Sequence, residues 1–322
     1  HVSVPAGSAA FDLQKLGVHG EIGFARDQQL VMVNKGEEDA GQYPGFLVCN
    51  RCGKTAFDPQ RVGPHERDYY LATRGTGRCT GQFEQVSLGY GFASDVLILR
   101  LPLSKPLRFD PVRTTEREPV SNALQSLAEA LVLGISQELD IDIREINAGF
   151  RFVRVGEEHF ADIFVYDTLS GGAGYATQAG ELFEAVMIRA EALLSRCTCS
   201  TSCDKCLRHY GNRFHHSILD RRLALDLLRY ARDGFIPAVP SHDEQRAILQ
   251  PLKDMMLLAG WSEDPSPAAP YVLTHQGRSA HLFSFPSLVH PDHYGFAPGM
   301  RCFAFSAFEL GRDLPGAYGE VA

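Results

Sequence analysis

Four closely spaced cysteines in the second half of the chain have the clearest chemical potential in the sequence. Cys197, Cys199, Cys203 and Cys206 follow the pattern CxCx3CxxC. Four thiolates at this spacing can close around one tetrahedral Zn²⁺ ion, and they leave no open position for a water molecule. The pattern therefore predicts a structural zinc site and not a hydrolytic one. The alternatives are an iron–sulfur cluster, which also takes four cysteines, and a redox pair of Cys203 with Cys206.

A second group of cysteines lies in the first half of the chain. Cys49 and Cys52 form a CxxC pair, and Cys79 follows 27 residues later. His65 lies about midway and could complete a set of three cysteines and one histidine. We therefore predict a second Zn²⁺ site here; the alternative is a metal-free loop in which Cys79 is a small buried apolar residue. The remaining cysteine, Cys302, stands apart, and clusters of this kind in a chain of 322 residues favour metal over disulfides.

The charge pattern bears on nucleic-acid binding. The formal net charge is −8, whereas a dedicated DNA-wrapping protein is usually basic, so DNA contact requires a local patch. Residues 205–232 are rich in arginine and histidine, and Tyr210 and Phe214 interleave with them, which suits phosphate contact combined with base stacking. The alternative is a solvated face that pairs with Asp220 and Asp226. The residues predicted to contact phosphate are Arg208, Arg213, Arg221 and Arg222.

Two weaker patterns leave alternatives open. Asp140, Asp142 and Glu145 are carboxylates of the kind that a Mg²⁺-dependent nuclease uses, but solvent-facing strand positions would look the same. Residues 171–174, Gly-Gly-Ala-Gly, lie between a predicted strand and a predicted helix. Their backbone N–H groups could receive a phosphate, or the glycines could serve a tight turn with positive φ.

The sequence shows no motif for nucleotide hydrolysis. Gly53-Lys54-Thr55 resembles the end of a phosphate-binding loop, but Val48 stands where that motif requires a glycine. We therefore expect that this stretch does not hydrolyse nucleotide on its own. The chain begins with His1, with nothing resembling a signal peptide after it, which predicts a piece of a longer polypeptide.

Apolar periodicity predicts the elements that hold these residues. Brief or continuous apolar runs predict strands over residues 21–24, 30–34, 95–103, 141–146, 160–166, 271–274 and 280–285. Apolar residues at helical spacing predict helices over residues 121–139, 175–195, 219–230 and 244–258. The second cysteine group directly follows the helix predicted over residues 175–195. No apolar run approaches the ~20 residues of a membrane helix, so we expect a cytoplasmic protein without a membrane partner.

These elements predict an α/β (α+β) fold with a mixed sheet core, amphipathic helices, cysteine-rich zinc knuckles and a small C-terminal α+β appendage. The predicted division is an N-terminal β segment over 1–45, a zinc knuckle over 46–85, a zinc-binding α/β domain over 86–236 and the appendage over 241–322.

Several of these motifs together resemble a known family. YDTLSGGAG at 166–174, a helix, CxCx3CxxC, LRHYGN at 207–212 and LDRRLAL at 219–225 resemble the MrfA-type zinc-binding domain. This domain is C-terminal to, or a partner of, superfamily 2 helicases, with versions in bacterial antiviral systems such as DISARM and Druantia. The resemblance covers about residues 45–232. It implies that the four clustered cysteines bind zinc and that a DNA translocase or helicase core is nearby, in DNA repair or antiviral defence.

Together with the resemblance, the residues imply a zinc-binding accessory module that scaffolds a helicase core and contacts DNA. Any ATPase or helicase activity would come from an upstream part of a longer chain or from a partner subunit. Two rivals belong to other classes. One is a metal-dependent nuclease that uses Asp140, Asp142 and Glu145, and the other is a pure interaction module whose basic residues bind only protein.

Overall fold

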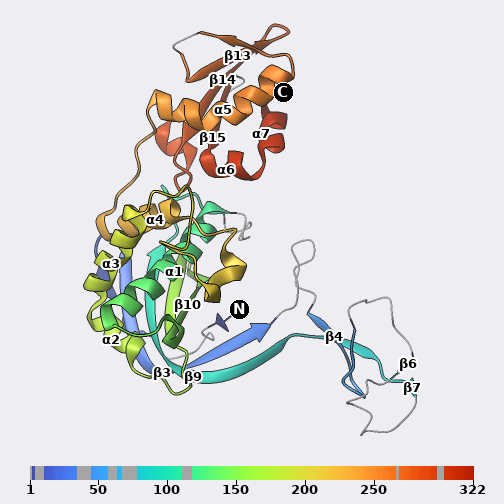
Figure 1. Ribbon diagram of the computed structural model, residues 1–322, viewed down its shortest axis with the longest axis vertical. Helices are drawn as coiled ribbons and strands as arrows, with labels where there is room; N and C mark the ends of the chain where they lie inside the picture. The colour runs from blue at the N-terminus through green and yellow to red at the C-terminus, as the bar shows by residue number, and fades with distance from the viewer. Residues whose placement is uncertain are drawn as a thin grey trace.

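The protein has a central body, a long arm and a C-terminal unit that lies at one end of the body (Figure 1). The structure is a computed structural model, and it describes residues 2–3, 11–34, 45–56, 64–66, 78–110, 118–265, 268–295 and 301–322. Sheets and helices are combined in both the body and the C-terminal unit, so the predicted α+β fold class is confirmed. The predicted domain boundaries stay predictions.

The body is built on a sheet in the order β1-β3-β9-β11-β10, with β2 added to β3, and the described pairs within it are antiparallel. Its strands are β1 (Val2–Ser3), β2 (Gln14–Leu16), β3 (Gly20–Asn34), β9 (Leu88–Pro102), β10 (Ile146–Val155) and β11 (Glu158–Asp167). The strands predicted over 21–24 and 30–34 are one strand, because a bulge between Ala25 and Gln28 lets β3 continue along β9.

Helices cover one face of this sheet, and their bounds are α1 (Pro119–Leu139), α2 (Tyr175–Glu181), α3 (Phe183–Arg196) and α4 (Arg221–Asp233). Helix α1 packs between β10 and β11 on one side and α3 and α4 on the other. It is therefore buried nearly all round from Pro119 to Ile135, and this buried surface includes the polar residues Gln125 and Glu129. Among the helices in the described part of the chain, none combines the length and apolar character needed to cross a bilayer.

Two predicted elements differ from the observed ones. The helix predicted over 175–195 is interrupted at Leu182, whose φ of −105° and ψ of 18° end α2 before α3 begins. Residues 141–146, predicted as a strand, contain the 3-10 helix η2 (Ile143–Glu145). The Asp142 carboxylate accepts the Arg144 N–H and so caps this turn, and a six-residue alternation of polar and apolar residues cannot distinguish such a turn from a strand.

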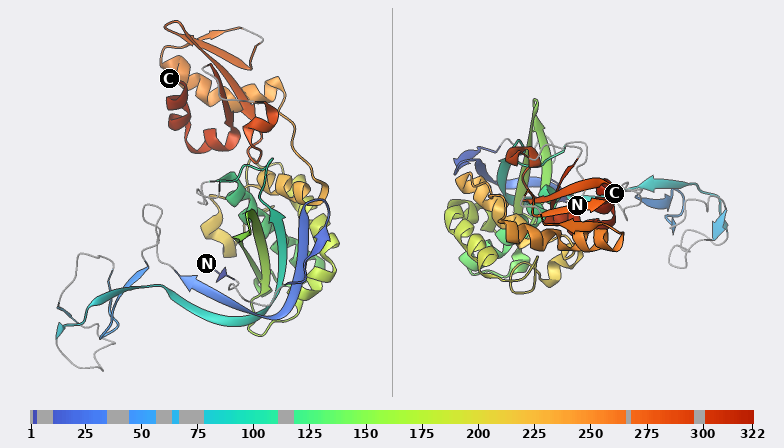
Figure 2. Two further views of the ribbon diagram at one scale, coloured as in Figure 1. Left: turned by 180° about the vertical axis from the view of Figure 1, so that it is seen from behind. Right: turned by 90° about the horizontal axis from the view of Figure 1, so that it is seen from above.

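The arm is formed where β3 and β9 continue past the end of β11 as a ribbon, and the short β1 pairs with β3 there, at Val31 and Met32 (Figures 1 and 2). At its far end lie β4 (Phe46–Cys49), β5 (Thr55–Ala56), β6 (His65–Glu66), β7 (Arg78–Cys79) and β8 (Phe83–Val86). These strands make a small sheet in the order β5-β4-β8 and a separate β6-β7 pair. The first cysteine group is therefore held at the tip of the arm, away from the body's core.

The C-terminal unit has its own sheet, in the order β12-β13-β14-β15, and its own core around Leu249, Leu252, Leu273 and Leu282. Pairing of β14 with β15 is parallel, which makes this sheet mixed. Its elements are α5 (His242–Leu258), β12 (Ser262–Asp264), β13 (Tyr271–His275), β14 (Arg278–Phe285), η4 (Pro291–Tyr294), β15 (Cys302–Ser306), α6 (Ala307–Arg312) and α7 (Leu314–Val321).

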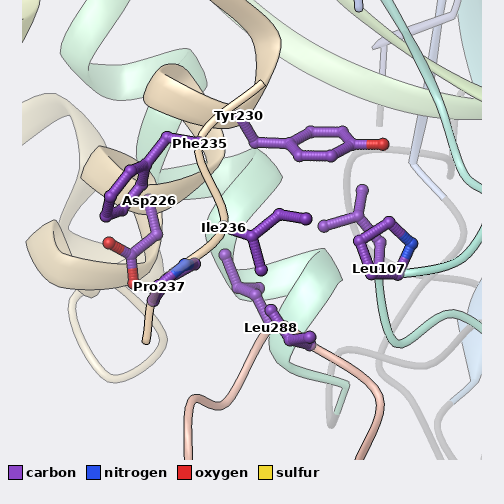
Figure 3. Close-up of a pocket in the computed structure, with 9 residues that line it drawn as sticks. Leu107, Asp226, Tyr230, Phe235, Ile236, Pro237 and Leu288 are labelled. Carbon is purple, nitrogen blue, oxygen red and sulfur yellow. The ribbon is translucent and has the colours of Figure 1, made fainter. Parts of the chain in front are cut away.

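A seam of backbone and side-chain contacts fastens this unit to the body. The Arg108 N–H donates to the Leu288 carbonyl at 2.8 Å, and the Arg108 guanidinium pairs with Glu309 at 2.6 Å. The seam contains a small pocket of about 10 Å³ that is lined mainly by apolar side chains and also by Asp226 (Figure 3). Burial raises the pKa of Asp226 to about 6.

This carboxylate should make stability depend on pH. The unfolded pKa is the lower one, so the folded state alone holds the proton between about pH 4 and pH 6, and stability falls as the pH rises through that window. Discounted for residual solvent contact, the expected loss is about 1–2 kcal/mol. We expect Asp226→Asn to unfold at higher urea than the parent protein at pH 8 and to lose most of that advantage at pH 4.5. An advantage of the same size at both pH values would contradict the assignment.

Candidate metal centres and nucleic-acid surface

The second cysteine group is assembled at the point where α3 ends. Cys197 caps the C-terminus of α3, and the turn from Cys203 to Cys206 is closed by a hydrogen bond from the Cys206 N–H to the Cys203 carbonyl. The Sγ–Sγ distances are 3.4 Å for Cys197–Cys199, 3.5 Å for Cys197–Cys203, 3.7 Å for Cys199–Cys206 and 3.9 Å for Cys203–Cys206. The sulfurs are too far apart for disulfide bonds, and all four thiols are free.

These distances fit a zinc ion. Four sulfurs at a Zn–S distance of about 2.3 Å form a tetrahedron whose edges are about 3.8 Å. All four sulfurs lie within 4.8 Å of one another. The donor set is thus complete, and zinc here would supply charge neutralisation and cross-linking of the loop, as expected for a structural site.

The thiols differ in their readiness to ionise. Burial raises the pKa of Cys206 to about 12, while a hydrogen bond from the Cys199 backbone N–H lowers the pKa of Cys197 to about 7. Cys206 is only 3% exposed and adjoins the main core of the body. A buried thiolate needs a nearby cation, so the group suits a bound divalent metal better than four free thiols.

Arg221 supports this group from α4. Its side chain is 8% exposed, and the guanidinium donates from Nε to the Cys199 carbonyl at 2.9 Å and from Nη1 to the Leu194 carbonyl at 3.2 Å. Burial raises the pKa of Cys199, and a hydrogen bond from Arg221 opposes that rise. Buried and hydrogen-bonded on two sides, Arg221 is not available to a phosphate, which corrects the prediction for this residue.

The other arginines predicted to contact DNA differ in accessibility. Arg208 is half-buried and donates from Nε to the Ser202 hydroxyl at 2.9 Å. Arg213 and Arg222 are exposed. The Arg213 guanidinium carbon lies 4.6 Å from the ring centre of Tyr210 and 4.3 Å from that of Phe214. The two rings are 81% and 79% exposed, so the Arg213 guanidinium and both rings lie together on the protein surface.

A buried carboxylate holds this aromatic segment, η3 (Tyr210–His215), against α1. Glu129 Oε2 accepts a hydrogen bond from Asn212 Nδ2 at 2.9 Å and lies 3.1 Å from His209 Nε2. Asn212 Nδ2 also donates to the Leu207 carbonyl, and Asn212 Oδ1 lies 2.9 Å from His216 Nε2. Glu129 was not identified from the sequence, although a carboxylate inside an apolar helix is the signal that could have indicated it.

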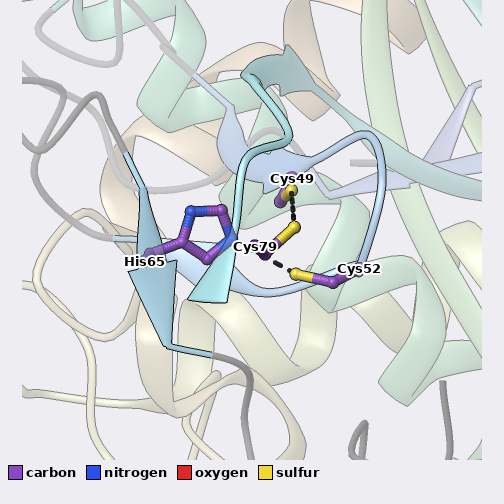
Figure 4. Close-up of side chains that lie close together, drawn as sticks. All are labelled: Cys49, Cys52, His65 and Cys79. Carbon is purple, nitrogen blue, oxygen red and sulfur yellow. Dashed lines mark hydrogen bonds between the residues drawn. The ribbon is translucent and has the colours of Figure 1, made fainter. Parts of the chain in front are cut away.

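The first cysteine group is also brought together (Figure 4). Cys49 Sγ lies 3.8 Å from Cys79 Sγ, and Cys52 Sγ lies 3.2 Å from His65 Nε2. The three cysteines are buried, and the ligand atoms of all four residues lie within 4.8 Å of one another. The pairing of β6 with β7 places His65 directly opposite Cys79, which explains how a histidine 13 residues after Cys52 reaches the group.

Close packing around these sulfurs supports a metal site. The Gly81 N–H points at Cys79 Sγ, 3.4 Å away, and a Cβ at position 81 would fall 2.6 Å from Cys49 Sγ. Burial raises the pKa of Cys49, but backbone N–H groups of Cys52 and Arg51 outweigh it and lower the pKa to about 6. Backbone N–H groups aimed at thiolate sulfur suit a zinc knuckle, so both cysteine groups could hold zinc.

The carboxylates of the nuclease alternative are not assembled in this way. Within the described residues, the groups of potential metal ligands that come close together are the two cysteine groups, and neither includes Asp140, Asp142 or Glu145. The Asp142 carboxylate instead pairs with the guanidinium of Arg144 at 2.7 Å. Nothing in this geometry supports a nuclease site.

The glycine-rich turn is occupied by the protein's own carboxylate. Asp167 is fully buried and accepts the backbone N–H groups of Ala173, Tyr175 and Ala176 at 2.6, 3.1 and 2.8 Å. Gly174 has a φ of +89°, as a tight turn requires. The turn interpretation of residues 171–174 is therefore correct, and the phosphate interpretation is wrong.

Comparison with known proteins agrees with the predicted resemblance. Residues 121–207 match the family model described as the MrfA Zn-binding domain. The chain is 36% identical over 334 residues to the Druantia protein DruE of Escherichia coli (strain UMEA 4076-1), a match that covers 98% of this chain and 18% of DruE. The chain thus spans less than a fifth of that relative's length.

Two solved structures are also similar. The crystal structure of the DUF1998 helicase MrfA bound to DNA matches with a TM-score of 0.40 and 12% identity, over 71% of this chain and 25% of that one. The structure of the same helicase bound to DNA and AMPPNP matches with a TM-score of 0.29 and 13% identity, over 70% of this chain and 23% of that one.

Proposed function

The chain contains a domain of the MrfA Zn-binding family, and from this premise we propose that it is the zinc-stabilised accessory part of a superfamily 2 DNA helicase or translocase. In this role it scaffolds the motor and contacts DNA, in bacterial antiviral defence or DNA repair. The motor is carried on the same polypeptide or on a partner subunit. The family match and the likeness to DruE support the proposal.

The observation that carries it is the closed tetrathiolate group directly beside an exposed cationic and aromatic surface. Zinc bound by four sulfurs has no open position, so its role is to hold structure. The structure it would hold includes the loop that leads from Cys206 to η3, where Arg213 lies between Tyr210 and Phe214. Guanidinium groups bind phosphate and aromatic rings stack on bases, so this loop is suited to nucleic acid.

The salt dependence of DNA binding tests the contact. Each neutralised phosphate of duplex DNA contributes about 0.9 to the slope of log Kd against log salt. We expect the double variant Arg213→Ala/Arg222→Ala of the full-length protein to lower this slope by about two, as measured by fluorescence anisotropy at several salt concentrations. Arg154→Ala, an exposed arginine at the end of β10, is the matched control and should leave the slope unchanged.

The outcome separates the proposal from its rival. A module that binds only protein predicts no change of slope in either variant, together with retention of the motor. An unchanged slope in the double variant would therefore remove the DNA contact from the proposal, while the zinc-dependent scaffold would stand on the metal measurements alone.

A further inference from the structure

The outer part of the arm carries a surface that the proposed function does not explain. Residues 28–34 of β3 pair with residues 88–94 of β9, past the end of β11, which pairs with β9 only from Val96 onward. The short β1 pairs with the other edge of β3 at Val31 and Met32, and it leaves the face of the ribbon open at β9. In this register Leu30 lies opposite Phe92, and Met32 lies opposite Tyr90. Opposite residues of an antiparallel pair point to the same face, so this face of the ribbon is apolar and aromatic.

The apolar face extends outward from a core inside the body. Leu30 is fully buried and Phe92 is half-buried, in a cluster that includes Phe164 and Tyr166. Ring contacts continue along it, at 5.9 Å from Tyr166 to Phe92 and 5.5 Å from Phe92 to Tyr90. Exposure then rises to 59% at Tyr90 and 51% at Leu88. This apolar face is therefore buried at its inner end and exposed to solvent at its outer end. Such a gradient is expected where a further protein surface covers the outer part.

The composition of the ribbon indicates what could cover it. Residues 28–34 (QQLVMVN) and 88–94 (LGYGFAS) contain no charged residue, in a chain where 22% of residues are charged. Nucleic-acid binding draws most of its free energy from neutralised phosphates, so an uncharged ribbon is a poor surface for DNA. An apolar protein surface is the partner that suits it.

The size of the face indicates where that protein surface comes from. Seven residue pairs at about 3.4 Å each, over a width of about 10 Å, make a face of roughly 240 Å², whereas a stable interface between separate proteins buries about 800 Å² on each side. Two copies of this face would be too small to hold a dimer. A surface on the same polypeptide needs less area, because covalent linkage raises its effective concentration to about the millimolar range.

The relative's length shows that such a polypeptide is available in this family, since 98% of this chain corresponds to only 18% of DruE. We propose that the face formed by Met32, Leu88, Tyr90 and Phe92, with the buried Leu30 beneath its inner end, docks on an apolar surface of the motor module carried on the same polypeptide. This inference rests on the proposed function in taking that polypeptide to carry the motor. Docking there would also anchor the zinc knuckle at the arm's tip.

The test is photo-crosslinking in the full-length polypeptide. Tyr90→p-benzoylphenylalanine places the photoreactive group on the exposed face, and the same substitution at Leu88 provides a second position. Leu258, which is 91% exposed at the end of α5, is the control position away from the arm. After irradiation without DNA, we expect monomer-sized products in which peptides containing position 90 are joined to peptides outside these 322 residues, in several-fold greater yield than from position 258.

Three other results would overturn the proposal. They are a product of twice the monomer mass, links confined to residues 1–322 in both arm variants, and yields no greater than those from position 258. The crosslinking is done without DNA and identifies the joined peptides. It therefore tests docking of the arm separately from the DNA contact, which is tested by the salt slope of binding.

Discussion

Replacing Cys206 with serine is expected to remove one zinc ion per chain and to lower the Tm of the body. Cys206 is buried against the main core, and the loops between the four cysteines are mostly polar, so metal holds this region in place of apolar packing. Structural zinc contributes about 10–16 kcal/mol of apparent binding free energy in small zinc domains. Even a third of that would lower the Tm of a unit this size by roughly 10 °C.

The measurement is a thermal melt with metal analysis of the same sample. Cys302→Ser is the matched control, because Cys302 is exposed and belongs to neither group, and it should change neither metal content nor Tm. Cys52→Ser should release metal from the arm while leaving the Tm of the body nearly unchanged, because the apolar cluster formed by the described residues at the tip consists of the three cysteines and Phe83 and is separate from the body's core. A Cys206→Ser protein with the parent's Tm and zinc content would contradict the account.

Arg221 and its neighbour Arg222 are expected to differ in how the same substitution, to methionine, affects Tm and zinc affinity. Arg221→Met leaves the carbonyls of Cys199 and Leu194 without their donor, at about 1–3 kcal/mol for each buried acceptor, and removes a positive charge beside a zinc thiolate. We expect a clearly lower Tm and zinc affinity reduced by about 10–100-fold, the range found when groups that support a metal ligand are lost.

The neighbouring variant supplies the control. Arg222→Met changes an exposed side chain, so its Tm and zinc affinity should match the parent's, while the salt slope of DNA binding falls by about one. Zinc affinity can be measured by competition with a chelator. If Arg221→Met binds zinc as tightly as Arg222→Met, the supporting role of Arg221 is wrong.

The same pair of arginines shows what spacing in a sequence can and cannot establish. The cysteine patterns indicated both metal groups, because ligand spacing is a local property, and His65 was identified as the one histidine between two cysteine elements. No comparable spacing rule tells which arginines in a run are exposed and which are buried. Residues 221 and 222 lie about 100° apart around α4, and only the packing of α4 beside α3 decides which of them is buried.

Long-range packing also explains the other differences. The apolar stripe of α1 was predicted from its period, but the role of Glu129 depends on a loop 80 residues later in the chain. The strands over 21–24 and 30–34 are one arm strand because β9 pairs with both, and that pairing joins segments more than 50 residues apart. The capped turn at Asp142 and the break at Leu182 depend on backbone geometry that apolar periodicity does not report.

Elemental analysis of the purified protein tests the central claim most directly. Two zinc ions per chain are expected, falling to one in Cys52→Ser and to one in Cys206→Ser, with a clearly lower Tm of the body only in the second variant. A protein that carries no stoichiometric zinc, or that keeps its Tm after a strong chelator has removed the metal, would contradict it.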